Sequence, residues 1–133
     1  MSEENVEIVR SMNNAYLLGD VAGALEALDD HIVWHGTVGG LDEGDVHRGR
    51  EEVVKAFADN FEAWERLTLD YEEYFDAGSN VVVFVHEIAR GRKSGVEIET
   101  DTAIVFAVEG GKITRAQAFM DRGAALEAAG LTE

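Results

Sequence analysis

The chain has 133 residues, of which 46% are hydrophobic and 29% charged, and this length and balance predict one globular domain spanning residues 1–133. Its 27 acidic residues against 11 lysines and arginines give a formal net charge of −16, which disfavours binding to nucleic acid or to an anionic membrane. Cysteine is absent, which excludes disulfide bonds, thiolate metal sites and cysteine nucleophiles.

The N-terminal part predicts two helices and a strand. Apolar side chains recur at helical spacing from about Glu3 to Leu18, and Gly19 ends this first helix. Asp20 is a favourable N-cap for a second, shorter helix with the sequence VAGALEALDD. The stretch from His31 to His35 mixes β-branched and aromatic residues and therefore predicts a short strand.

The middle of the chain predicts a loop followed by a third helix. The segment from Thr37 to Gly49 is rich in glycine and charged residues, which is typical of an irregular loop. From Arg50 the pattern is helical again, and Glu51 and Glu52 suit the positive end of the helix dipole. The face that packs on the core carries an apolar stripe: Val53, Val54, Phe57, Phe61 and Trp64.

The C-terminal half predicts an antiparallel meander and a last short helix. Its four strands have the sequences LTLDYEEYF, VVVFVHEIARGR, VEIETDTAIVFAVE and ITRAQAFMD, and tight turns join them. The tail DRGAALEAAGL predicts a helix that ends at Gly130. Helix, helix, strand, helix and meander together predict the α+β class, with a sheet that curls around the helices and leaves a closed-ended cavity.

Six short marks along the chain resemble one superfamily. They are Gly19-Asp20, Asp29-Asp30, Val33-Trp34-His35, the segment RGRE at 48–51, Gly111-Lys112-Ile113 and the segment FMDR at 119–122. In order and spacing they resemble the SnoaL-like polyketide cyclase and ketosteroid isomerase-like branch of the nuclear transport factor 2-like superfamily, over nearly the whole chain. The resemblance implies a cone-shaped α+β barrel, in which three N-terminal helices pack in a curved antiparallel sheet, and a homodimer. It does not imply one reaction, because the superfamily includes isomerases, cyclases, dehydratases and non-catalytic binding modules.

The resemblance also suggests catalytic positions. Ketosteroid isomerase uses an aspartate base and an oxyanion hole made of a tyrosine and a protonated aspartate. By position the base corresponds to His35, whose reference pKa near ~6.5 suits proton transfer at neutral pH. The oxyanion tyrosine falls near Met12, one turn from Tyr16, and the second acid falls at Ala103, two residues after Asp101. The isomerase triad is therefore not intact, and we do not expect steroid isomerisation by that mechanism.

Two further residues have both a functional and a structural interpretation. SnoaL-like cyclases keep an acid/base aspartate near the end of the last strand, at about the position of Asp121, but this residue could instead cap the final helix. His86 interrupts an apolar strand and shares a face with Phe84 and Ile88, which the resemblance places along the pocket. It could instead be a satisfied core histidine. His86, His35 and Asp101 could bind zinc or iron chemically, but they lack a local metal-binding spacing, so we expect no metal.

Apolar residues are expected to line the cavity or to fill the core. The lining residues that we expect are Met12, Trp34, Phe57, Phe61, Phe84, Ile88, Ala103, Ala118 and Met120. Such a cavity suits a hydrophobic small molecule.

Three hypotheses of function follow. In the first, the protein is an enzyme that abstracts a proton next to a carbonyl group, giving isomerisation, cyclisation or dehydration without a cofactor. His35 would be the general acid or base, assisted by Tyr16, His86 and Asp101 or Asp121. In the second, the same cavity binds an apolar metabolite without catalysis. In the third, side chains fill the cavity and the domain only binds a partner. The acidic start MSEENVEIVR lacks an apolar signal segment, so we expect a cytoplasmic protein.

Overall fold

The computed structural model describes residues 2–131, and the side chains of residues 3–131. Its elements, in chain order, are α1 (Ser2–Leu17), α2 (Val21–Glu26), β1 (Leu28–Val38), β2 (Val46–Arg48), α3 (Gly49–Ala63), β3 (Trp64–Ala77), β4 (Asn80–Gly91), β5 (Glu97–Glu109), β6 (Lys112–Phe119) and α4 (Arg122–Ala128). The α+β class is confirmed. Among the helices of the described residues, none is both long enough and apolar enough to span a membrane.

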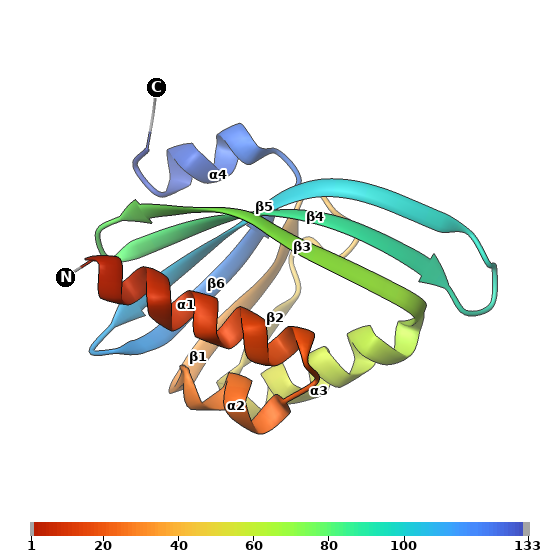
Figure 1. Ribbon diagram of the computed structural model, residues 1–133, viewed down its shortest axis with the longest axis horizontal. Helices are drawn as coiled ribbons and strands as arrows, with labels where there is room; N and C mark the ends of the chain where they lie inside the picture. Colours follow the sequence, from red (N-terminus) through yellow and green to blue (C-terminus); the bar gives the residue numbers. More distant parts are fainter. Residues whose placement is uncertain (1, 132–133) are drawn as a thin grey trace.

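The strands form one curved sheet in the order β2-β1-β6-β5-β4-β3. Figure 1 shows α1, α2 and α3 on one side of this sheet and α4 on the other. We call the side that faces α1–α3 the inner face and the side under α4 the outer face. The predicted arrangement of three N-terminal helices within a curved sheet is therefore confirmed.

Alternation along the strands divides the core between the two faces. On β4, Val81, Val83 and Val85 point inward and belong to the larger core cluster, which α1 completes with Val9 and Met12. These α1 residues recur at helical spacing, which explains why this amphipathic segment is helical. Each fully buried aliphatic side chain contributes roughly 1.5–3 kcal/mol, so this cluster supplies much of the driving force for folding.

The outer face has a smaller core of its own. Val82, Ala103 and Val105 pack against Ala125 and Ala129 at the C-terminal helix. Elsewhere the outer face carries the polar side chains of His86, Glu99 and Asp101.

Several boundaries differ from the sequence prediction. The second helix ends at Glu26 and β1 begins at Leu28, so Leu28, Asp29 and Asp30 are strand residues and not the end of that helix. The segment expected to be a loop contains β2, which pairs with β1 through Val33 and Arg48, because backbone hydrogen bonds to a distant strand compensate for weak local propensity. The third helix ends at Ala63, and Trp64 has the extended backbone of β3. The sheet is also not wholly antiparallel, since β1 and β6 run parallel.

Candidate functional site

Four aromatic residues that the sequence analysis assigned to the candidate site, Tyr16, Trp34, Phe57 and Phe61, meet on the inner face. The ring of Tyr16 lies 4.8 Å from that of Phe57 and 4.8 Å from that of Phe61. The rings of Trp34 and Phe57 meet edge to face at 5.2 Å, a favourable geometry for aromatic pairs. Phe61 remains 36% exposed, so this cluster reaches the surface.

Tyr16 is held by a chain of hydrogen bonds from α3 and β3. Asn60 Nδ2 donates to the Tyr16 hydroxyl at 2.9 Å, and Trp64 Nε1 donates to Asn60 Oδ1 at 3.2 Å. Burial raises the pKa of Tyr16, the hydrogen bond from Asn60 lowers it, and the charge of Glu87 raises it. With the net shift upward, the Tyr16 hydroxyl is protonated and neutral at physiological pH.

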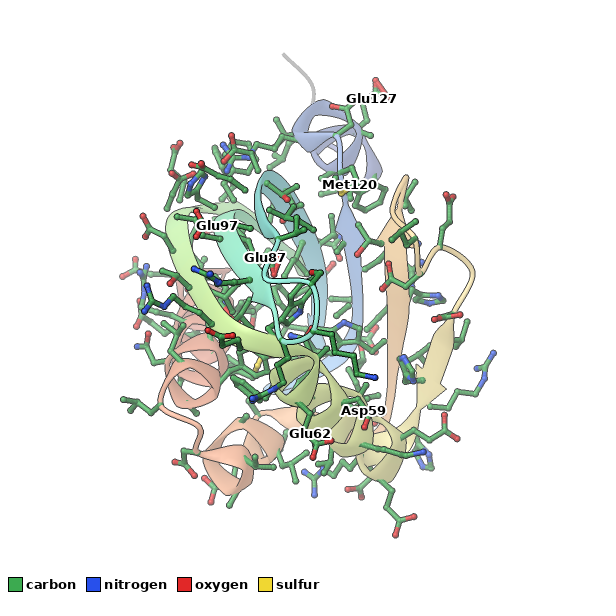
Figure 2. The ribbon with its side chains drawn as sticks, turned by 90° about the vertical axis from the view of Figure 1, so that its right-hand side faces the viewer. Asp59, Glu62, Glu87, Glu97, Met120 and Glu127 are labelled. Atoms are coloured by element: carbon green, nitrogen blue, oxygen red, sulfur yellow. The ribbon has the colours of Figure 1, made fainter. Side chains whose placement is uncertain are left out.

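The sequence prediction missed Glu87. This residue lies on the inner face of β4 because it shares the parity of Val85, and it pairs with Leu69 on β3 and with Thr100 on β5. Figure 2 shows Glu87 near the centre of the open side of the curved sheet, above α3. Partial burial raises the pKa of its carboxyl group. Among the described residues, none forms a hydrogen bond or an ion pair with this group.

Glu87 and two tyrosines are within electrostatic range of one another. Burial is the main cause that raises the pKa of Tyr71, and the charges of Tyr16 and Glu87 add to it. A signal for Glu87 was present in the sequence, since it is the single carboxylate on the apolar face that carries Val83 and Val85. His86 instead favours the opposite face of the same strand, because a histidine is unusual among apolar strand residues.

The expected position of His35 on the inner face is wrong. Trp34 is the residue of this strand that points inward, and it pairs with Ala116 of the inner core. His35 has the opposite parity and pairs with Gln117, on the outer face. Partial burial lowers the pKa of His35, and the charges of Arg115 and Arg48 lower it further.

His86 also lies on the outer face, within a polar cluster. Its Nδ1 lies 2.5 Å from Asp101 Oδ1, and its Nε2 lies 2.8 Å from Glu99 Oε2. Because both ring nitrogens face carboxylates, this arrangement favours the charged ring, in which both nitrogens carry protons. The hydrogen bond with Asp101 is the main cause that raises the pKa of His86, and the same bond lowers the pKa of Asp101. The expectation that His86 and Asp101 face the pocket is therefore corrected.

The remaining predicted residues divide between the two faces. Phe84 lies under Arg122 on the outer face, 4.5 Å from its guanidinium carbon to the ring centre, and Ile88 has the same parity. Ala103 is fully buried in the outer core. Met12 lies in the inner core with 2% of its side chain exposed, and Ala118 pairs with Ile104 of the inner face. A ligand-binding role for these two residues stays a prediction.

The end of the last strand resolves an alternative left open by the sequence. Asp121 precedes α4, and its side chain accepts a hydrogen bond of 2.8 Å from the backbone N–H of Gly123. Asp121 is thus the N-cap of α4, as the structural interpretation predicted. Met120 is 40% exposed and lies against Gly39.

Two surface hollows occur elsewhere on the molecule. One is lined by residues of β2 and α3, which are His47, Glu52, Lys55, Ala56 and Asp59, and the other by residues of α1, which are Glu3, Glu4, Glu7 and Ile8. Neither involves the histidines or the aromatic cluster described above. A hydrophobic pocket therefore stays a prediction.

The curved six-stranded sheet and its helices are those of the nuclear transport factor 2-like fold. A family model described as a SnoaL-like domain matches residues 9–116, and the chain therefore belongs to the SnoaL-like domain family. This family includes polyketide cyclases and isomerases. A comparison with curated protein sequences finds no match.

Solved structures share the fold. A nuclear transport factor 2-like protein from Burkholderia thailandensis E264 is 26% identical, with 93% of this chain and 95% of that chain covered and a TM-score of 0.80. A protein described as a SnoaL-like polyketide cyclase, from Jannaschia sp. CCS1, is 19% identical, with 98% and 94% covered and a TM-score of 0.79. The protein TerC, co-crystallised with polyporic acid, is 21% identical, with 96% and 98% covered and a TM-score of 0.76.

Proposed function

We propose that this protein is a cofactor-independent enzyme that performs acid–base chemistry on a small, largely apolar carbonyl compound at the inner face. The observation that carries the proposal is the carboxyl group of Glu87, which is partly buried, lacks an ion-pair partner among the described residues and has a raised pKa. Desolvation is a recognised means of moving a carboxylic acid toward the pH at which it both takes and returns a proton.

The surroundings of Glu87 suit such a substrate. Leu69 and Val85 border it with hydrocarbon surface, and the aromatic cluster around Tyr16 extends this apolar surface. The neutral Tyr16 hydroxyl can donate a hydrogen bond to a carbonyl oxygen. The proton-transfer role that the sequence assigned to His35 therefore passes to Glu87, whereas Tyr16 keeps its predicted role.

The similar structures support an organic ligand. TerC was co-crystallised with polyporic acid, and the Jannaschia protein is described as a polyketide cyclase. We infer from these similarities that the inner face of this chain also accepts a small organic molecule.

Proton exchange provides a direct test. A panel of cyclic ketones is incubated with the protein in D₂O, and the loss of α-proton signals is followed by NMR. Glu87→Gln should slow the exchange by roughly 10²–10⁴-fold, the usual contribution of a general acid or base. His35→Ala should leave the rate unchanged, because His35 lies on the outer face. Wild-type exchange no faster than in buffer across the panel would overturn the proposal.

The stability of the same variant separates catalysis from unfolding. The folded pKa of Glu87 is raised above its unfolded value, so at neutral pH the fold carries a carboxylate that burial destabilises. Replacing it with neutral glutamine should therefore keep or raise the thermal midpoint while exchange is lost. Loss of exchange together with a lower midpoint would not support a catalytic role.

A non-catalytic binding module is the second candidate. The partly exposed Phe61 beside Tyr16 favours it, because aromatic surface binds apolar molecules without any proton transfer. Under this alternative, the wild type binds ketones without accelerating their exchange, and Phe61→Ala weakens binding.

A further inference from the structure

The direction of each hydrogen bond from Trp64 through Asn60 to Tyr16 follows from chemistry. An indole N–H can only donate. The amide atom of Asn60 that lies 3.2 Å from Trp64 Nε1 must therefore be the oxygen. The NH₂ group of Asn60 is then the end that lies 2.9 Å from the Tyr16 hydroxyl oxygen, and it must donate.

This polarity leaves the proton of Tyr16 available. A phenol oxygen that accepts from Asn60 keeps its own O–H to donate elsewhere. Among the described residues, none accepts that proton. Glu87 is near enough for its charge to affect Tyr16, yet it forms no hydrogen bond with the hydroxyl.

We propose that Asn60 and Trp64 are positioning residues that hold the Tyr16 hydroxyl as a hydrogen-bond donor for an acceptor oxygen of the ligand. The inference rests on the proposed function, because the ligand must occupy the inner face beside Tyr16. It adds a rule of selection: a ligand with a carbonyl oxygen is favoured over the matching hydrocarbon. The rule depends on Asn60, whose side chain forms hydrogen bonds with Tyr16 and Trp64.

The hydrogen bond from the Trp64 indole fixes the orientation of the Asn60 amide, so substitutions at either residue should change the hydrogen bond at Tyr16. In Asn60→Asp one carboxylate oxygen still accepts from Trp64, but the other oxygen now accepts the proton of Tyr16. The substitution keeps the shape of the side chain, but Tyr16 now donates its proton to residue 60 instead of accepting a hydrogen bond from it. In Trp64→Phe the ring is kept and the N–H is lost, so the amide of Asn60 is free to turn over.

A first experiment needs no ligand. The chain has three tyrosines, Tyr16, Tyr71 and Tyr74, so their signals can be assigned by single replacement with phenylalanine. With fluorinated tyrosine, which titrates nearer to neutral pH, fluorine NMR follows each phenol separately. Asn60→Asp should move the titration of Tyr16 to higher pH, and Trp64→Phe should move it in the same direction, while Tyr74 stays in place. If both variants leave the Tyr16 titration unchanged, the positioning role is overturned.

A second experiment measures selection with 1-tetralone and its hydrocarbon counterpart tetralin. The affinity for 1-tetralone divided by the affinity for tetralin should fall roughly five- to tenfold in Tyr16→Phe and in Asn60→Asp. A fall of this size corresponds to the loss of one hydrogen bond. Tyr74→Phe is the matched control, because Tyr74 also accepts from an asparagine, Asn13 Nδ2 at 3.1 Å, and it should keep the wild-type ratio.

The outcomes distinguish this inference from the proposed function. An unchanged affinity ratio in Tyr16→Phe and Asn60→Asp overturns the donor role, while ketone exchange that depends on Glu87 would still support the enzyme. Conversely, a reduced affinity ratio in these variants, with no ketone proton exchange by the wild type, supports the donor role of Tyr16. The protein would then be a binding module and not an enzyme. Failure of the wild type to bind 1-tetralone contradicts the donor site.

Discussion

Glu87 and His86 are neighbours on β4, yet they lie on opposite faces of the sheet and have different surroundings. Glu87 lies on the apolar inner face, near enough to Tyr16 and Tyr71 to raise the pKa of each, whereas His86 is held between Asp101 and Glu99. The sequence draws attention to the histidine because its type is unusual in an apolar strand. Burial raises the pKa of the Glu87 carboxyl group, and this burial exists only in the folded chain.

At the residue scale, His86 should make stability depend on pH. Its folded pKa is raised, so its contribution is fully present below its unfolded pKa of about 6.5 and is lost as the pH rises through the folded pKa. The folded pKa of Asp101 is lowered, so its contribution is present above about 3.9 and is lost as the pH falls through the folded pKa.

Urea unfolding of the wild type and His86→Gln across this range provides the measurement. The difference in unfolding free energy should be largest between pH ~4 and ~6.5 and should shrink at higher pH. In an Asp101→Asn background most of this dependence should disappear, because the main partner is gone. A difference that is constant with pH would show that the ring charge contributes nothing.

At the scale of elements, the helix boundaries were predicted where local chemistry determines them. Gly19, with φ +73°, ends α1 as expected, since this backbone conformation favours glycine. The end of α3 was misplaced because the apolar stripe continues through Trp64. That residue begins β3 and pairs with Gly91, yet its indole still reaches back to Asn60, one helical turn earlier.

The cap of α4 gives a prediction at this scale. Asp121→Ala should destabilise the protein by about 1 kcal/mol, because the backbone N–H of Gly123 loses its acceptor. Asp121→Asn should keep both stability and ketone exchange, because asparagine is an equally good N-cap. Chemical denaturation and the exchange assay measure the two quantities. Loss of exchange in Asp121→Asn at unchanged stability would instead support an acid/base role for Asp121.

For the whole molecule, we propose a homodimer formed through the outer face. Arg48 and Arg115 both pair with Val33 on β1, so one side of this face carries positive charge. Across the sheet, the same face carries Glu99 and Asp101 on β5. A two-fold axis would bring the basic side of one copy against the acidic side of the other, a self-complementary arrangement.

Light scattering at low and high salt should detect this assembly. Arg115→Glu should shift the protein toward the monomer, and added salt should weaken the wild-type dimer, because screened charges attract less. Lys55→Glu on α3 makes the same change in charge away from the outer face and serves as the control. A wild-type mass equal to one chain at all salt concentrations would rule out the dimer.

The sequence by itself determined the order and type of most elements, the α+β class and the family, because helical and strand periodicity, caps and turn glycines are local properties. The apolar neighbours of Tyr16 on its helix also indicated the side that packs against the inner core. The tertiary structure alone decided which side of each strand is the inner one. Strand alternation predicts that Glu87 and His86 lie on opposite faces of the sheet, but it does not predict which face is the inner one. The sides became distinct when α1 and α3 packed on one face and α4 on the other. The same packing joined Asn60, Trp64 and Tyr16, which are far apart in sequence or lie on different elements, into one chain of hydrogen bonds.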